Sequence, residues 1–235
     1  MFSPSDFLRF LRSPKIISSE VSVTNMFMTA LKIYLASLIL IGLVNFLNIT
    51  MLTTFVTLPH DMTFDIPERF QNNFLSYFAY AVLLVPVFEE TVFRLPLKIT
   101  PLNISLAVST LCLLLFHKIL PAGKCIFLSS LVFIIFYLSV SKCRDVIEEE
   151  LRSKYKWFFY ILTLSFGLVH CYNYKVIFVY QFFLLPVLVL PQLLMGLVLS
   201  FSRIYYKNGF FISLLIHILM NSAAILTSSL NQSVL

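Results

Sequence analysis

The sequence is poor in charge. Asp, Glu, Lys and Arg together make up 12% of its 235 residues, while 59% of the residues are hydrophobic. A soluble domain of this length needs about a quarter of its residues charged to cover its surface. Lipid, rather than water, is therefore the expected solvent for most of the chain.

Other absences narrow the class of protein further. The four cysteines, Cys112, Cys125, Cys143 and Cys171, form no CxxC pair, so neither a disulfide framework nor a thiolate metal site is expected. The first 25 residues are mixed polar and basic and lack the apolar core of a signal peptide, so we expect a cytoplasmic lead-in. No internal repeat or low-complexity linker divides the chain, which favours one membrane domain over residues 1–235.

What the sequence does contain is a series of apolar stretches. A spanning helix needs about 20 mainly apolar residues. This criterion predicts an all-α, polytopic transmembrane bundle of about seven spanning helices. The predicted spans cover about residues 26–49, 74–95, 102–117, 125–140, 157–172, 176–200 and 210–227.

The basic residues favour one orientation of this bundle, with the N-terminus in the cytoplasm. The inner segments then hold Arg9, Arg12, Lys15, Arg94, Lys98, Lys142, Arg144, Arg152, Lys154, Lys156, Arg203 and Lys207. The outer segments hold only Arg69, Lys118, Lys124 and Lys175, with Lys32 left over at the first helix. The net charge of +6 thus follows membrane topology and does not indicate nucleic acid. The three glutamates at 148–150, within the charged segment 142–156, are expected to lie on a solvated loop or the face of a surface helix.

Charged side chains interrupt the second apolar stretch, which reads LLVPVFEETVFRLPLK. A charged residue at a helix centre in lipid costs about 2.5–3.5 kcal/mol, so it is a functional candidate by default. Glu90 and Arg94 lie four residues apart, share a helix face and can form an ion pair. Glu89 lies about 100° around the helix from Glu90 and is left free to face a cavity. Pro86 removes a backbone hydrogen bond and is expected to kink the helix beside the carboxylates.

Two later stretches carry polar side chains at helical spacing. The fifth ends in SFGLVHCYNY, where Phe166 and His170 share a face and Gly167 permits close approach of a neighbouring helix. The seventh contains LLIHILMNS, with His217 and Asn221 one turn apart. A carboxylate, two imidazoles and a carboxamide on three helices can converge on one water molecule. Such a group can supply a general base, a proton-transfer partner and an oxyanion donor.

Each of these side chains also has a purely structural interpretation. A lone intramembrane histidine is often an interhelical hydrogen-bond partner, and Asn221 alone is more often structural. Glu90 and Arg94 are assigned mainly to structure. Glu89 is harder to dismiss, because one arginine cannot cheaply neutralise two adjacent carboxylates. The combination of residues, more than any one of them, points to a working site.

These residues resemble the motifs of one family, the CPBP intramembrane proteases, also called the Abi or CAAX-protease family. The family pattern is EExxxR, FxxxH and HxxxN or HxxxD, each on a different transmembrane helix. Here the motifs are Glu89–Arg94, Phe166–His170 and His217–Asn221. The motif core covers about residues 74–98 and 157–228, and an extra helical hairpin over about 101–141 lies outside it.

The resemblance implies an endopeptidase that acts within or at the edge of the bilayer. Its substrate would be a membrane-associated protein or peptide, which is prenylated in the family's eukaryotic branch. Carried over residue by residue, Glu89 would activate water and His170 would assist it, while His217 and Asn221 would stabilise the oxyanion. The supporting residues would be Glu90, Arg94 and Phe166.

The chain departs from the family pattern in the long gap between its first two motifs. The extra hairpin brings His117 closer in sequence to Glu89 than His170 is, although the FGLVH match favours His170. His117 stands beside Lys118 at the end of a short helix and is expected at the interface. A second difficulty is the depth at which the site residues lie in the membrane. In the predicted topology Glu89 lies towards the inner side and His170 towards the outer side, so their convergence requires helix tilt, a kink at Pro86 or revised spans.

No cofactor is favoured, and zinc is the alternative. Two histidines and a glutamate can form a catalytic zinc site, here Glu89, His170 and His217. However, no HExxH helix is present. If zinc is bound, Glu89 can serve either as a ligand or as the base. The other role is then unfilled unless Glu90 takes it, which would require Glu90 to separate from Arg94. Metal-free catalysis by glutamate is therefore the preferred prediction.

Two other functions would use the same buried groups. One is a non-catalytic immunity or scaffold protein that binds a peptide in the same cavity, and the other is a proton-coupled transporter with the glutamate as its relay. For the peptidase, we expect a multi-pass protein of the bacterial cytoplasmic membrane. Its partners would be the bilayer and a peptide or protein substrate, lipidated or unmodified, and no nucleic acid.

Overall fold

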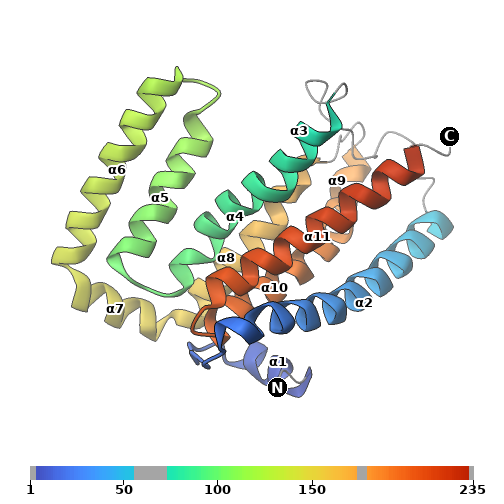
Figure 1. Ribbon diagram of the computed structural model, residues 1–235, viewed down its shortest axis with the longest axis horizontal. Coiled ribbons are helices and arrows are strands. Elements are labelled where there is room, and N and C mark those ends of the chain that lie inside the picture. The colour runs from blue at the N-terminus through green and yellow to red at the C-terminus, as the bar shows by residue number, and fades with distance from the viewer. Residues whose placement is uncertain (1–3, 56–72, 174–178, 233–235) are drawn as a thin grey trace.

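The computed structural model describes residues 4–55, 73–173 and 179–232, and every named element in these ranges is helical (Figure 1). The elements are α1 (Pro4–Arg12), α2 (Val23–Phe55), α3 (Phe74–Ala79), a π turn (Tyr80–Leu84), α4 (Val85–Phe93), a 3₁₀ turn (Leu95–Leu97), α5 (Pro101–Phe116), α6 (Ala122–Lys142), α7 (Arg144–Ser153), α8 (Tyr155–Val169), a 3₁₀ turn (His170–Asn173), α9 (Val179–Leu188), α10 (Leu190–Tyr205) and α11 (Gly209–Gln232). The all-α prediction is therefore confirmed for the described residues.

Within the described residues, three stretches are long and apolar enough to cross a membrane: Thr24–Asn48, Ala122–Lys142 and Gly209–Thr227. Helices α9 and α10, which meet at a bend of 42°, add a fourth if they are one broken span. These helices mark the chain as a membrane protein. Length alone does not establish the predicted seven spans, because α5 and α8 have 16 and 15 residues and a π turn separates α3 from α4.

A proline explains why the predicted span 176–200 is broken. Pro191 has no amide hydrogen, so it cannot bond to the carbonyl of Val187 one turn earlier. That carbonyl instead accepts a hydrogen bond from Asn48 Nδ2 of α2, at 2.9 Å. Residues 176–178 of the predicted span, and Arg69 and Lys175 of the predicted outer segments, lie outside the described residues.

The N-terminal lead-in contains a helix that the sequence analysis did not predict. The buried Phe10 of α1 contacts the rings of Phe159 and Phe201 edge-on, with centroids 5.4 and 4.9 Å away. The Tyr160 hydroxyl donates a hydrogen bond to the carbonyl of Leu11. Helix α1 therefore packs against α8 and α10, at the end of the bundle that also carries α7 (Figure 1). Helix α7, expected as a loop or surface helix, has no buried residues.

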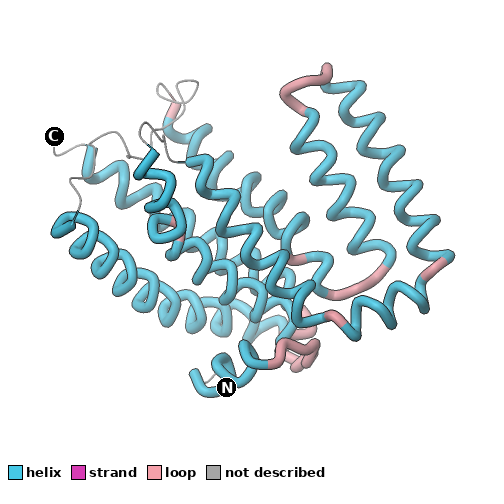
Figure 2. Tube along the Cα trace, turned by 180° about the vertical axis from the view of Figure 1, so that it is seen from behind, coloured by secondary structure: helices cyan, strands magenta, loops and turns pink. Residues whose placement is uncertain are grey.

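Helix α10 forms the centre of the bundle, where it packs against α8, α11 and α2. Its close approach to α8 depends on Gly167, because a Cβ atom there would lie 2.3 Å from Leu193 Cδ2. The α5–α6 hairpin stands to one side in both views (Figures 1 and 2). It is joined to the bundle chiefly through contacts of α5 with α4 and the 3₁₀ turn at Leu95–Leu97. Of the motif helices, α8 and α11 pack against α10, and α4 packs against α8 and α11 while its following 3₁₀ turn contacts α10.

Candidate functional site

The helix that carries the two glutamates is irregular just before them. Residues Tyr80–Leu84 form a π turn that leads into α4. Pro86 cannot donate a backbone hydrogen bond, so it cannot extend the π pattern to the carbonyl of Ala81. That carbonyl instead accepts a hydrogen bond from Asn221 Nδ2 of α11, at 2.9 Å. The irregularity expected at Pro86 therefore takes the form of a π turn, which Asn221 supports from a neighbouring helix.

Glu90 and Arg94 form the predicted ion pair. Arg94 Nε lies 3.7 Å from Glu90 Oε1, and both side chains are fully buried. The guanidinium also lies over the ring of Phe166, with Cζ 3.6 Å from the centroid, as in a cation–π contact. Within the described residues, the Arg94 side-chain nitrogens have no hydrogen-bond partner. Charge and the aromatic face, more than hydrogen bonds, therefore hold this buried cation.

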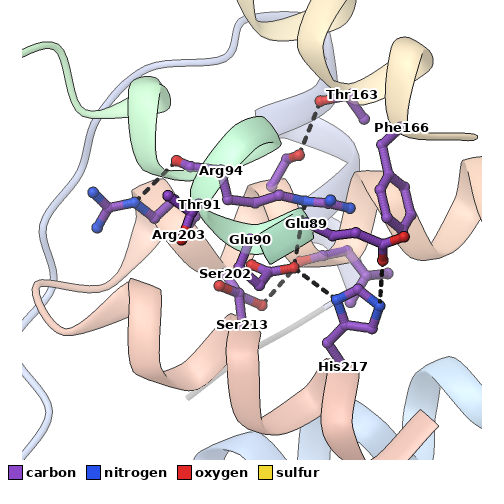
Figure 3. Close-up of polar contacts among 12 residues, drawn as sticks. Glu89, Glu90, Thr91, Arg94, Thr163, Phe166, Ser202, Arg203, Ser213 and His217 are labelled. Carbon is purple, nitrogen blue, oxygen red and sulfur yellow. Dashed lines mark hydrogen bonds and ion pairs between the residues drawn. The ribbon is translucent and has the colours of Figure 1, made fainter. Parts of the chain in front are cut away.

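His217 lies between the two glutamates (Figure 3). Its Nδ1 is 2.9 Å from Glu90 Oε1 and its Nε2 is 3.2 Å from Glu89 Oε2. The Nδ1 contact is a hydrogen bond, whereas the Nε2 contact has the distance of an ion pair without hydrogen-bond geometry. A doubly protonated ring would place its positive charge beside both carboxylates. With His217 doubly protonated, its charge and that of Arg94 balance the two carboxylates. The cluster is then neutral, as burial in a membrane protein requires.

Glu89 differs from the rest of the cluster in its exposure. Its side chain is 21% exposed, whereas those of Glu90 and His217 are 0% and 1% exposed. The helix geometry that separates the two carboxylates was predicted from the sequence. The structure adds that both carboxylates contact the His217 ring, and that of the two only Glu89 keeps part of its side chain exposed.

Phe166 brings the remaining histidine to the site. Its ring lies 4.8 Å from the ring of His170 and 5.7 Å from that of His217, centroid to centroid. His170 Nδ1 is 2.8 Å from the carbonyl oxygen of Phe166. A carbonyl only accepts, so Nδ1 carries a hydrogen. His170 also interacts electrostatically with Glu89.

The structure therefore places His170 and His217 against the same Phe166 ring, in the part of the bundle to which the FGLVH motif assigned His170. His117 instead lies exposed at the C-terminal end of α5, with Nδ1 2.7 Å from the carbonyl oxygen of Leu114. Its expected interfacial position is consistent with this exposure.

Asn221 is near the site but points elsewhere. Its amide nitrogen is engaged with Ala81, which is the interhelical structural role that a lone asparagine favours. The oxyanion role implied by the family resemblance stays a prediction.

Two polar residues that the sequence analysis did not assign to the site also adjoin it. Ser213, one turn before His217 on α11, interacts with Glu90 (Figure 3). Arg203 donates from Nε to the carbonyl of Arg94, at 3.1 Å. The spacing of Ser213 to His217 was a usable signal. Arg203 follows an apolar stretch, where a basic residue by itself indicates only the inner side of a membrane.

The side chains proposed as zinc ligands are Glu89, His170 and His217. Among the described residues, no three His, Cys, Asp or Glu side chains are grouped closely enough to hold a metal ion. Zinc remains the alternative that metal analysis of the purified protein would test.

Comparison of the sequence with protein-family models, with curated proteins and with solved structures finds no match. The motifs and their geometry therefore carry the functional argument by themselves.

Proposed function

We propose that the protein is an intramembrane endopeptidase in which Glu89 activates water. The observation that carries this proposal is the arrangement of the buried cluster. Three of its members, Glu90, Arg94 and His217, are closed off, and Glu89 alone is partly exposed while held by His217. An accessible carboxylate oriented by a second side chain is what a general base requires.

The chemistry uses these side chains as follows. Glu89 takes a proton from water as the oxygen attacks the carbonyl carbon of a peptide bond. The tetrahedral oxyanion then collapses, the carbon–nitrogen bond breaks, and the leaving amine takes the proton from Glu89. His217 orients Glu89, and its positive charge stabilises the oxyanion. His170 assists through Nε2, while Glu90 and Arg94 hold His217 and Phe166 in place.

The resemblance to the CPBP family supports the same proposal, since all three motifs meet in space. Within it, the chain has about seven spans with the N-terminus inside, in a bacterial cytoplasmic membrane. The substrate is a membrane-associated peptide or protein, lipidated or unmodified. Catalysis by glutamate without metal is preferred, and zinc held by Glu89, His170 and His217 is the alternative.

A comparison of cellular peptides and protein termini tests this proposal even while the substrate is unidentified. Cells would express the wild type, Glu89→Gln, or Glu149→Gln, whose carboxylate is exposed on α7. At equal membrane abundance, we expect Glu89→Gln alone to accumulate uncut substrate. Identical termini in all three strains would overturn the peptidase, and a phenotype that persists in Glu89→Gln without cleavage would indicate peptide binding. Loss of stoichiometric zinc together with activity on chelation would replace the metal-free mechanism.

A further inference from the structure

Two helix ends meet beside the buried cluster. Helix α4 and the 3₁₀ turn after it end at Leu97, and α10 ends at Tyr205. The last carbonyls of any helix lack partners within the helix and carry the negative end of its dipole. Pro96, which cannot donate, stops α4 from continuing. Each of these two ends is therefore a place where a cation is favourable.

Arg203 binds the end of the α4 segment, and Lys98 binds the two residues that follow α10. The last carbonyls of α10 itself, those of Ile204 and Tyr205, accept from the backbone amides of residues 17–19. Arg203, in the last turn of α10, donates from Nε to the carbonyl of Arg94 at 3.1 Å and from Nη2 to that of Leu95 at 3.3 Å. In return, Lys98 Nζ donates to the carbonyls of Tyr206 and Lys207, at 2.8 and 3.0 Å. The arrangement is reciprocal, because each of the two segments supplies a cation that binds main-chain carbonyls of the other.

The two cations are themselves close neighbours. Burial and the charge of Arg203 lower the pKa of Lys98 to about 8. Two like charges repel each other, so the carbonyl contacts must offset that repulsion. The side chain of Arg203 is buried among them, with 5% of the residue exposed. A pair of basic residues that only marks the inner side of a membrane would face water instead.

The backbone links this pair to the glutamates. Arg203 donates a hydrogen bond to the main-chain carbonyl of Arg94. The amide of Arg94 in turn donates to the main-chain carbonyl of Glu90, and the Arg94 side chain pairs with the Glu90 carboxylate. We propose that Arg203 and Lys98 form a reciprocal clamp that fixes α4 against α10, which makes them positioning residues for Glu89 and Glu90. The catalytic part of this inference rests on the proposed peptidase function, and the structural part does not.

The clamp is tested by Arg203→Gln and Lys98→Met, with Arg152→Gln and Lys142→Met as matched controls at exposed basic positions. Hydrogen exchange of the purified proteins would follow the amides of residues 85–97. We expect either clamp variant to speed exchange there by about tenfold or more, and the controls to leave it unchanged. Exchange that stays at the wild-type rate in both clamp variants would overturn the clamp, whether or not the protein is a peptidase.

Steady-state cleavage of a peptide identified from the termini comparison tests the positioning role. A misplaced base lowers kcat by about 10- to 100-fold with little change in KM. Arg203→Lys, which keeps the charge but loses the two-pronged donor, should recover part of kcat. Normal kcat with only a lowered unfolding temperature would show a purely structural role and overturn the positioning claim. If the wild type cleaves nothing, the proposed function fails while the exchange result still decides the clamp. Should Arg203→Gln not fold, Lys98→Met alone decides both measurements.

Discussion

Glu89 and Glu90 are adjacent in the chain, yet their carboxylates have different surroundings. Glu90 is enclosed with Arg94 and bonded to His217 Nδ1. Glu89 contacts the opposite nitrogen of the same ring and keeps 21% of its side chain exposed. The 100° step of an α-helix per residue is what gives neighbours such different roles.

Removing the charge of Glu90 should destabilise the fold strongly. Glu90→Gln keeps the shape of the side chain but leaves Arg94 buried without its counterion, which costs about 3–5 kcal/mol. The free energy of unfolding in detergent micelles measures this loss. Glu149→Gln, at an exposed position on α7, is the control and should change it by less than about 0.5 kcal/mol. Similar small changes in the two variants would contradict the ion pair.

Among the helices, α4 depends on its neighbours for its shape. In the π turn that precedes it, the carbonyl of Ala81 accepts a hydrogen bond from Asn221 of α11. At the other end of α4, the carbonyl of Arg94 accepts one from Arg203 of α10. An irregular helix held at both ends by other helices can keep two carboxylates in fixed positions.

Loss of the Asn221 amide should loosen the π turn. Asn221→Ala leaves the partly buried carbonyl of Ala81 without the Asn221 amide, at a cost of about 1 kcal/mol. Hydrogen exchange of the amides at residues 80–85 should rise more than that of α2. Asn173→Ala, at an exposed asparagine, should alter neither. If exchange in the π turn does not change in Asn221→Ala, the support role is wrong.

The contact between α8 and α10 can be tested at Gly167. Gly167→Ala places a methyl group 2.3 Å from Leu193 Cδ2, and such overpacking costs about 1–3 kcal/mol. Gly42→Ala in α2 is the matched control, because nothing lies within 4 Å of its Cβ position. Combining Gly167→Ala with Leu193→Ala should give less than the sum of the two losses in unfolding free energy. Additive losses would show that the two residues do not meet.

For the molecule as a whole, apolar patterning predicted most of the helices. The expected spans 125–140 and 210–227 lie within α6 and α11, because long apolar runs leave a chain in lipid little alternative to helix. The pairs Glu90–Arg94 and Phe166–His170 followed from helical spacing alone, since residues four apart share a face.

What the sequence could not show are the consequences of tertiary packing. The placement of His217 between both glutamates depends on how α11 lies against α4, which no spacing within one helix encodes. The π turn at Tyr80–Leu84 requires a partner for the Ala81 carbonyl from α11. Helix α1 was missed because it is only nine residues long and is stabilised by its aromatic contacts with α8 and α10.

The orientation of the molecule in the membrane can be tested at a native cysteine. Cys143 is exposed at the junction of α6 and α7, at the end of the bundle that also carries α1. With the other three cysteines changed to serine, a membrane-impermeant thiol reagent should label Cys143 only from the cytoplasmic side. Labelling from the opposite side would reverse the proposed topology.

The role of Glu89 as the base is the central claim, and purified protein tests it most directly. Cleavage of an identified substrate by the wild type would be compared with that by Glu89→Gln, with Glu149→Gln as the control. We expect kcat of Glu89→Gln to fall by about 10²- to 10⁴-fold, the contribution of a general base, while the variant stays folded and the control keeps full activity. Cleavage by Glu89→Gln at the wild-type rate would contradict the account.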